Sequence, residues 1–198
     1  MRSVALILLA GVFMLAGCAS VSYTEPTDGP RTRVRFAVGE ATSRAGAVAL
    51  YQENAVVTGF SDENCNNGRQ WMALLDGYLV NSDPRSLGIP LSNYHRNAAK
   101  EFYVSTAQPM NIMFVGDMAS FNGVSQTTTY CPVMISAPLT PGVDYEFVYV
   151  ANGARSCIVQ MSEIMAGPNG AAQRNVIRTF DNGFDEVSPG CIDFFNRY

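Results

Sequence analysis

The residues that could act in catalysis are few and widely separated in this sequence. His95 is the only histidine, and no Gly-x-Ser-x-Gly segment presents a serine, so a hydrolytic triad would have to be built around His95. Acid pairs such as Asp62-Glu63 and Asp185-Glu186 lie in turn-like runs, whereas glycoside hydrolysis needs two buried carboxylates at a fixed separation. The sequence therefore favours a protein that is not an enzyme, and a hydrolase that depends on His95 ranks last.

Possible metal ligands are present but lack the spacing that a metal site needs. Asp181 to Glu186 supplies oxygen atoms around a turn but not the alternating ligands of an EF-hand, and the turn chemistry of Asn182-Gly183 explains the segment more simply. Met110 and Met113 offer thioethers, which are soft ligands for copper(I), but residues three apart on a strand point to opposite faces. No glycine-rich phosphate loop is visible either. We expect no metal and no cofactor.

The composition is that of a folded domain with a weakly charged surface. Apolar residues make up 47% of the chain and charged residues 15%, and the formal net charge is −4. Nucleic-acid binding needs a basic patch that displaces counterions, and Lys100 is the only lysine. We therefore expect no nucleic-acid partner.

The first residues of the chain have the pattern of a targeting signal. An apolar run from Val4 to Ala16 follows Arg2 and is too short to cross a bilayer, which takes about 20 residues. It ends in Leu15-Ala16-Gly17-Cys18, which matches the lipobox of bacterial lipoproteins. The resemblance implies that residues 1–17 are a lipoprotein signal peptide and that Cys18, acylated with palmitate-type chains, becomes the membrane-anchored N-terminus.

The lipobox also implies a place for the rest of the chain. Residues 18–30 are small and polar, with Pro26, Gly29 and Pro30 near the end, and we expect a flexible tether, with a single domain over 31–198. Ala19 stands where an Asp favours inner-membrane retention in lipoproteins of enteric-type bacteria. The expected location is therefore the outer membrane with the domain in the periplasm, and the cell surface is the alternative.

Four cysteines remain once Cys18 carries lipid: Cys65, Cys131, Cys157 and Cys191. An even number in an oxidising compartment predicts two disulfides, and three pairings are open.

Short runs of alternating or β-branched residues predict an all-β domain. Arg33 and Arg35 alternate with Val34 and Phe36 in 31–38, which indicates a strand with one buried face and a solvated arginine face. The other predicted strands are 48–51, 56–57, 102–105, 111–117, 127–137, 143–150, 157–164 and 175–180. Short strands with regular turns and at most one short helix indicate a mainly β fold, either a sandwich or a barrel.

The short helix is predicted over 71–79. Trp71, Leu74, Leu75 and Tyr78 recur at helical spacing. The following segment, Asn81 to Tyr94, is predicted to be a loop. Trp71, Tyr78 and Tyr94 are the aromatic residues that could line a surface for a ligand or a partner.

Two of the cysteines are predicted to face the core. Cys131 shares a face with Val133, and Cys157 shares one with Val159. If the turns 138–142 and 152–156 are both simple hairpins, the two cysteines lie near the same end and point inward, which permits a core disulfide. Cys65 would then pair with Cys191 by elimination, and Cys157 with Cys191 is the second-best pairing.

Three short motifs carry a second resemblance. Arg33-Val34-Arg35-Phe36, Arg85-Ser86-Leu87-Gly88-Ile89-Pro90 and Pro141-Gly142-Val143-Asp144-Tyr145-Glu146 resemble segments of a group of small, functionally uncharacterised proteobacterial lipoproteins. The resemblance implies a two-sheet antiparallel β-sandwich, transthyretin-like or immunoglobulin-like, and brings no site residues with it.

These observations lead to a ranking of functions. The first is a membrane-anchored binding or scaffolding module that presents an edge strand or the loop Asn81 to Tyr94 to another envelope protein. The alternative is a lipoprotein that binds a small ligand or a metal near Trp71 to Tyr94, and the third is an envelope hydrolase.

Overall fold

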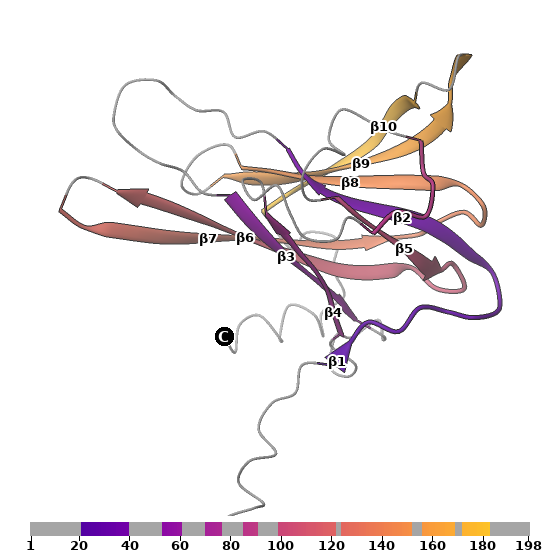
Figure 1. Cartoon of the computed structure of the whole chain (residues 1–198), viewed down its shortest axis with the longest axis horizontal. Helices are drawn as coiled ribbons and strands as arrows, with labels where there is room; N and C mark the ends of the chain where they lie inside the picture. Colours follow the sequence, from indigo (N-terminus) through magenta and orange to yellow (C-terminus); the bar gives the residue numbers. More distant parts are fainter. Residues whose placement is uncertain are drawn as a thin grey trace, which may run out of the picture.

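A computed structural model describes residues 21–39, 53–60, 70–76, 85–90, 99–121, 124–151, 156–168 and 172–182. These residues form two five-stranded sheets packed face to face (Figure 1), which confirms the predicted β-sandwich. The first sheet contains, in spatial order, β1 (Val21–Ser22), β4 (Gln70–Asp76), β3 (Glu53–Phe60), β6 (Met110–Phe121) and β7 (Gln126–Ala137). The second sheet contains β10 (Ala172–Asp181), β9 (Cys157–Ala166), β8 (Asp144–Ala151), β2 (Arg31–Val38) and β5 (Lys100–Ser105).

The pairing of the described strands is mainly antiparallel, with two exceptions. β1 pairs with β4 in parallel, and β2 pairs with β8 in parallel. The second exception has a consequence, because it places Arg35 beside Glu146 on β8, while the antiparallel partner β5 places Glu101 on the other side of Arg35. Two motifs that are more than a hundred residues apart thus become neighbours in one sheet.

The predicted helix over 71–79 is wrong where the structure describes it, because Gln70–Asp76 forms strand β4. Met72, Ala73 and Leu75 are all buried, so this is an apolar run buried on both faces rather than an amphipathic surface segment. Such a run matches a helical stripe as well as a strand, and the irregularity at Val57/Thr58 opposite β4 further obscures a period of two. Pairing with β3 decides in favour of the strand.

The core lies between the sheets and is centred on Phe36. Its ring lies 5.8 Å from that of Phe102, 5.7 Å from Phe114 and 6.0 Å from Phe147, so rings from β2, β5, β6 and β8 pack together. The inward residues predicted on the later strands are buried, including Val133 and Val159.

A disulfide joins the two sheets between Cys131 on β7 and Cys157 on β9, with Cα atoms 6.1 Å apart. This confirms the predicted core pair. The route of the chain differs from the prediction, because residues 138–143 pass from the first sheet to the second. Of the two pairs predicted as hairpins, β7–β8 and β8–β9, only β8 and β9 are antiparallel neighbours. Cys65 and Cys191 lie outside the described residues.

Gly116 on β6 provides the space for a side chain of the opposite sheet. Tyr149 reaches across the core, stacks on Phe114 with ring centroids 6.2 Å apart, and donates a hydrogen bond to the Cys131 carbonyl at 3.1 Å. A Cβ atom on Gly116 would overlap the Tyr149 ring and hydroxyl. The glycine is therefore required by packing and not by its backbone angles.

We expect Gly116→Ala to lower the free energy of unfolding by about 3 kcal/mol, the upper end for an overpacked core, because a whole ring must move. Urea denaturation measures the change. Gly142→Ala is the control: its added Cβ meets nothing within 4 Å, and its positive φ costs about 1 kcal/mol. Equal losses in the two variants would contradict the packing role of Gly116.

The predicted solvated arginine face is wrong for Arg35, whose side chain is 1% exposed. Its Nη2 atom lies 2.6 Å from a Glu101 oxygen and its Nη1 atom 3.2 Å from a Glu146 oxygen, and Glu146 also accepts from Arg174 Nε at 2.9 Å. We call Arg35, Glu101, Glu146 and Arg174 the buried ion cluster. Buried charges are tolerated only when each has partners, and here each has at least one.

The segment 85–90 covers this cluster. Arg35 donates to the carbonyls of Ile89 and Pro90 at 2.6 and 2.9 Å. The second Glu101 oxygen accepts from the backbone amides of Leu87 and Ile89. The described part of the predicted loop 81–94 is therefore fastened to the outer face of the second sheet by charge-assisted hydrogen bonds, which are stronger than those between neutral groups.

The predicted flexible tether also differs from what is found, because the chain belongs to the sandwich from Val21 onward. Val21–Ser22 pairs with β4, and Tyr103 on β5 receives a hydrogen bond from the Tyr23 hydroxyl at 2.9 Å and donates its amide to Glu25 at 2.9 Å. Thr106 N donates to Pro30 O at 2.9 Å. These contacts satisfy backbone groups along the free edge of β5, which is a common protection against edge-to-edge pairing.

Candidate functional site

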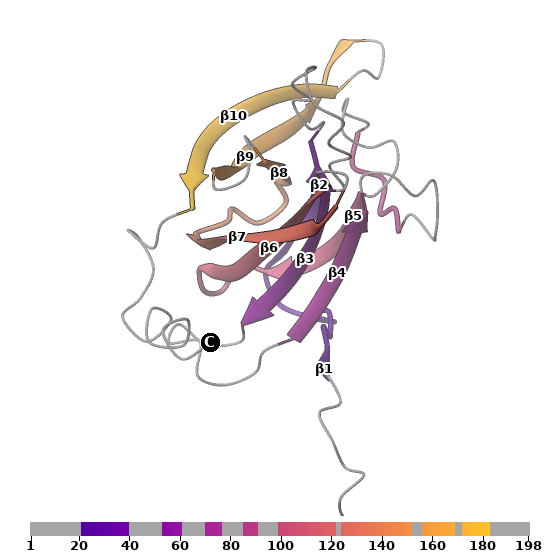
Figure 2. The ribbon, with the colours of Figure 1, turned by 90° about the vertical axis from the view of Figure 1, so that its left-hand side faces the viewer.

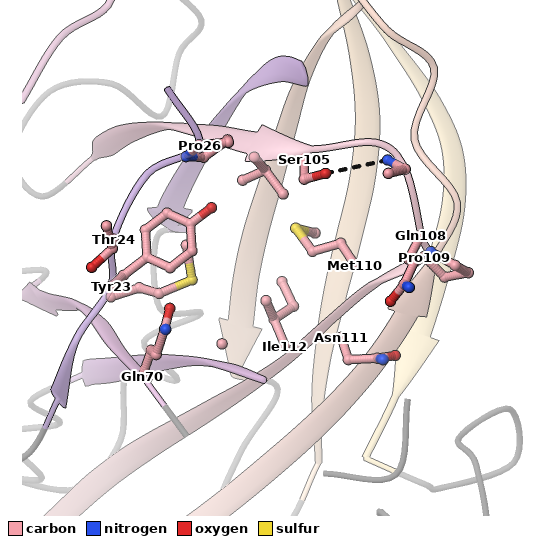
Figure 3. Close-up of a pocket in the computed structure, with 14 residues that line it drawn as sticks. Tyr23, Thr24, Pro26, Gln70, Ser105, Gln108, Pro109, Met110, Asn111 and Ile112 are labelled. Carbon is pink, nitrogen blue, oxygen red and sulfur yellow. Dashed lines mark hydrogen bonds between the residues drawn. The ribbon is translucent and has the colours of Figure 1, made fainter. Parts of the chain in front are cut away.

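A cavity of about 420 Å³ lies at the end of the sandwich where the N-terminal segment joins it. Its walls come from residues 23–26, from the first residues of β4, and from the end of β5 with the start of β6. In Figure 3 the side chains of Tyr23, Gln70, Met110 and Ile112 point toward a common centre. We call this the N-terminal pocket, and its volume is within the range typical of ligand sites.

The floor of the N-terminal pocket is apolar. It contains Met72, Val104, Met110 and Ile112, all buried and all members of the main core cluster. Gly59 lies beside the Met72 side chain, where an added Cβ would be 3.0 Å from the sulfur. Methionine is flexible and polarizable, so two methionines let the floor adapt to the shape of an apolar group.

The rim is polar and neutral. Gln70 and Gln108 contribute amides and Thr24 and Ser105 contribute hydroxyls. The Ser105 hydroxyl accepts from the Ala107 amide at 3.3 Å, so it is held by the β5–β6 connection. None of the described residues that line the pocket is charged. The described residues therefore suit a neutral ligand, because a charged one would be desolvated without a counter-charge.

Tyr23 closes one side of the pocket, and the fold changes the pKa of its phenol. Burial, and secondarily the negative charge of Glu25, raise the pKa of Tyr23 from 10.0 to about 12. The ring also contacts Phe102 edge-on at 5.9 Å. Since the neutral phenol is the form that donates to Tyr103 O, this hydrogen bond requires the protonated state.

The pKa of Tyr23 predicts a loss of stability at high pH. A group whose folded pKa is raised stabilises the fold fully below its unfolded pKa of 10.0, and this contribution disappears as the pH rises from 10 to about 12. We expect Tyr23→Phe to be less stable by about 1 kcal/mol at neutral pH, through the lost hydrogen bond, and less sensitive to pH in that window.

Phenolate absorbance of wild type minus Tyr23→Phe should titrate with a midpoint near 12. Tyr130→Phe, at a phenol that is 66% exposed on β7, is the control and should keep the alkaline loss of stability. A difference titration near 10 would contradict the buried position of Tyr23.

Of the three aromatic residues predicted to line a ligand surface, the structure describes the backbone of one, Trp71. Trp71 lies in β4 between Gln70 and Met72, which both line the pocket, but its side chain is outside the described part. Tyr78, Tyr94, His95 and Cys18 lie outside the described residues, as do both acid pairs. Met110 lines the pocket, whereas Met113 is opposite Met134 on the other face of β6, as predicted from the period of two.

The sequence did not reveal Tyr23, Gln70 or Ile112 as site residues. They come from three separate segments, and Tyr23 lies in the stretch predicted to be a tether. Within the described ranges, no cluster of three or more histidine, cysteine or acidic residues could hold a metal ion. No described helix has the length and apolar character to cross a membrane.

Comparisons with known proteins give no family. No protein-family model, curated protein or solved structure matches this chain.

Proposed function

We propose that this protein is a membrane-anchored lipoprotein whose sandwich domain is a binding module, with the N-terminal pocket as its binding site. The observation that carries the proposal is the pocket itself: an apolar floor with a neutral polar rim, built where the chain enters the domain. Lipid on Cys18 and an outer-membrane, periplasm-facing location belong to the same proposal. They are supported by the lipobox and by a core disulfide, which forms and persists in oxidising compartments.

A non-catalytic role is part of the proposal. The carboxylates that the fold brings together, Glu101 and Glu146, are both bound to Arg35 and have side chains only 4% and 0% exposed. A catalytic carboxyl has to reach a substrate, and these two are occupied in fastening segment 85–90 and strand β8. The buried ion cluster is a structural element.

The proposal is tested on protein purified from its own membranes. Intact mass spectrometry should show an acylated Cys18 as the N-terminus, and organic extraction should release a neutral compound in stoichiometric amount. Ser105→Trp places a large side chain at an exposed rim position and should abolish retention of the compound. Asn175→Trp, exposed on β10, is the matched control. A chain beginning at Met1, or equal retention by both variants, would overturn the proposal.

Binding of a protein partner is the second candidate function. It is favoured by the end of the β9–β10 pair where Ala166 pairs with Ala172. Met165, Val176 and Ile177 are 47%, 48% and 44% exposed, and β10 is an edge strand. An edge strand can add a strand from a partner, although the irregularity between Val176 and Arg178 disturbs the pairing. If this edge binds an envelope protein, Val176→Lys should reduce the amount of partner that is recovered after crosslinking in cells. Thr179→Lys, at an exposed position nearer the other end of β10, should not.

A further inference from the structure

The N-terminal pocket lies next to the point where the proposed lipid anchor leaves the domain. Val21 pairs with Gln70, a pocket residue, and Tyr23 and Thr24 line the pocket two and three residues later. Cys18 precedes Val21 by three residues, so its Cα atom lies within about 11 Å of that of Val21, whatever path the chain takes. In Figure 2, β1 lies beside one end of β4, at the edge of the sandwich. An anchor on Cys18 would therefore hold this end of the domain at the bilayer surface.

The chemistry of the pocket restricts what it can hold. Its floor presents aliphatic and thioether groups from Met72, Val104, Met110 and Ile112. Its polar lining residues are neutral, and apart from the buried Asn111 most of them lie toward the rim. A sugar or a peptide backbone would leave its polar groups without partners on this floor, at a desolvation cost. A hydrocarbon chain carries no such groups, and a polar head could remain among the amides and hydroxyls at the rim.

The size of the pocket agrees with one hydrocarbon chain. If each methylene group takes about 30 Å³, roughly the share of one water molecule, a cavity of about 420 Å³ holds on the order of a dozen of them. Because a linear chain is flexible, the two methionines of the floor can adapt to it.

We propose that the N-terminal pocket binds a single fatty acyl chain of the membrane in which the protein is anchored. This inference rests on the proposed lipoprotein function and names the ligand of the same site. The acyl chain could come from the lipid on Cys18 itself or from a neighbouring phospholipid. Both sources present the same polymethylene chemistry, and transfer between bilayer and pocket exchanges one apolar environment for another, so binding is reversible.

The test uses the full-length protein in its own cells. Cells are fed a fatty acid with a diazirine near its terminal methyl group and are irradiated, and the protein is purified and digested. We expect crosslinks on peptides from Gln70–Asp76 and on peptides that contain the first residues of β6, Met110 to Ile112. Crosslinked peptides joined to the N-terminal Cys18 peptide identify the protein's own lipid, and peptides that lose mass with phospholipase identify a phospholipid. Either result supports an acyl occupant.

Three variants test whether the crosslinks depend on the pocket: two at its rim and one control on β10. Ser105→Trp and Gln108→Trp, both at exposed rim positions, should lose at least nine-tenths of the pocket crosslinks, and Asn175→Trp should keep them. Labelled lipid on Cys18 with no crosslink in the pocket strands would overturn the acyl inference. A neutral compound that copurifies with the protein and is released by organic extraction would then leave the binding function standing. Absence of both the lipid and a retained compound would instead overturn the proposed function.

Discussion

Arg35→Met is expected to lower the free energy of unfolding by about 3–5 kcal/mol, the largest single effect in this protein. Methionine keeps much of the aliphatic volume but removes the charge that faces Glu101 and Glu146, whose side chains are 4% and 0% exposed. The carbonyls of Ile89 and Pro90 lose their donors as well. Lysine cannot replace Arg35, because three guanidinium nitrogens reach four different residues.

The matched control is Arg33→Met on the same strand. Arg33 binds Asp144 through two nitrogens at 2.7 and 2.6 Å, but its side chain is 33% exposed, so water can replace part of the interaction. We expect a loss of about 1 kcal/mol. Urea denaturation compares the two variants, and losses of equal size would contradict the special position of Arg35.

Two further measurements separate loss of charge from loss of packing. Adding Glu101→Gln to Arg35→Met removes one of the uncompensated charges and should recover part of the stability. Hydrogen exchange of the Leu87 and Ile89 amides, which donate to Glu101, should accelerate more in Arg35→Met than in Arg33→Met, because Arg33 donates only one hydrogen bond to this segment, to the Leu87 carbonyl at 3.0 Å. Unchanged protection in Arg35→Met would show that segment 85–90 is held by other contacts.

Breaking the Cys131–Cys157 disulfide is expected to cost about 3.5 kcal/mol, the value that chain entropy gives for a sequence separation of 26. The bridge joins β7 of one sheet to β9 of the other, and both cysteines are buried, at 3% and 0% exposed. Its main effect is to limit the unfolded chain, so the folded sandwich should keep its circular dichroism spectrum after reduction.

The experiment must separate the stability contributed by the Cys131–Cys157 disulfide from any effect of reductant on the other cysteines. Urea denaturation is run with and without reductant on the wild type and on Cys131→Ala/Cys157→Ala. In the double variant, reductant acts only on the remaining cysteines, so the excess loss in the wild type is the contribution of this disulfide. An excess near zero would contradict the expectation.

The sequence by itself determined the elements whose signal is local. The strand 31–38 was predicted with the bounds that the structure has, and the strands from 102 onward fall on β5 to β10. Side-chain alternation along a strand depends only on the backbone period of two, so the inward faces of Cys131 and Cys157 could be predicted. Their pairing was predicted correctly, but on the further assumption of two hairpins, and β7 and β8 lie in different sheets.

Tertiary structure decided everything that depends on what covers the second face of an element. Arg35 lies on the face away from the core, as the pattern indicates, but that face is covered by segment 85–90 and flanked by acids 66 and 111 residues away. The same cause turned an expected helix into β4, whose two faces are both buried, and made residues 23–26, which were expected to be a tether, a wall of the pocket. Periodicity reports which residues share a face, whereas burial, ion pairing and cavities arise from segments that only the completed fold brings together.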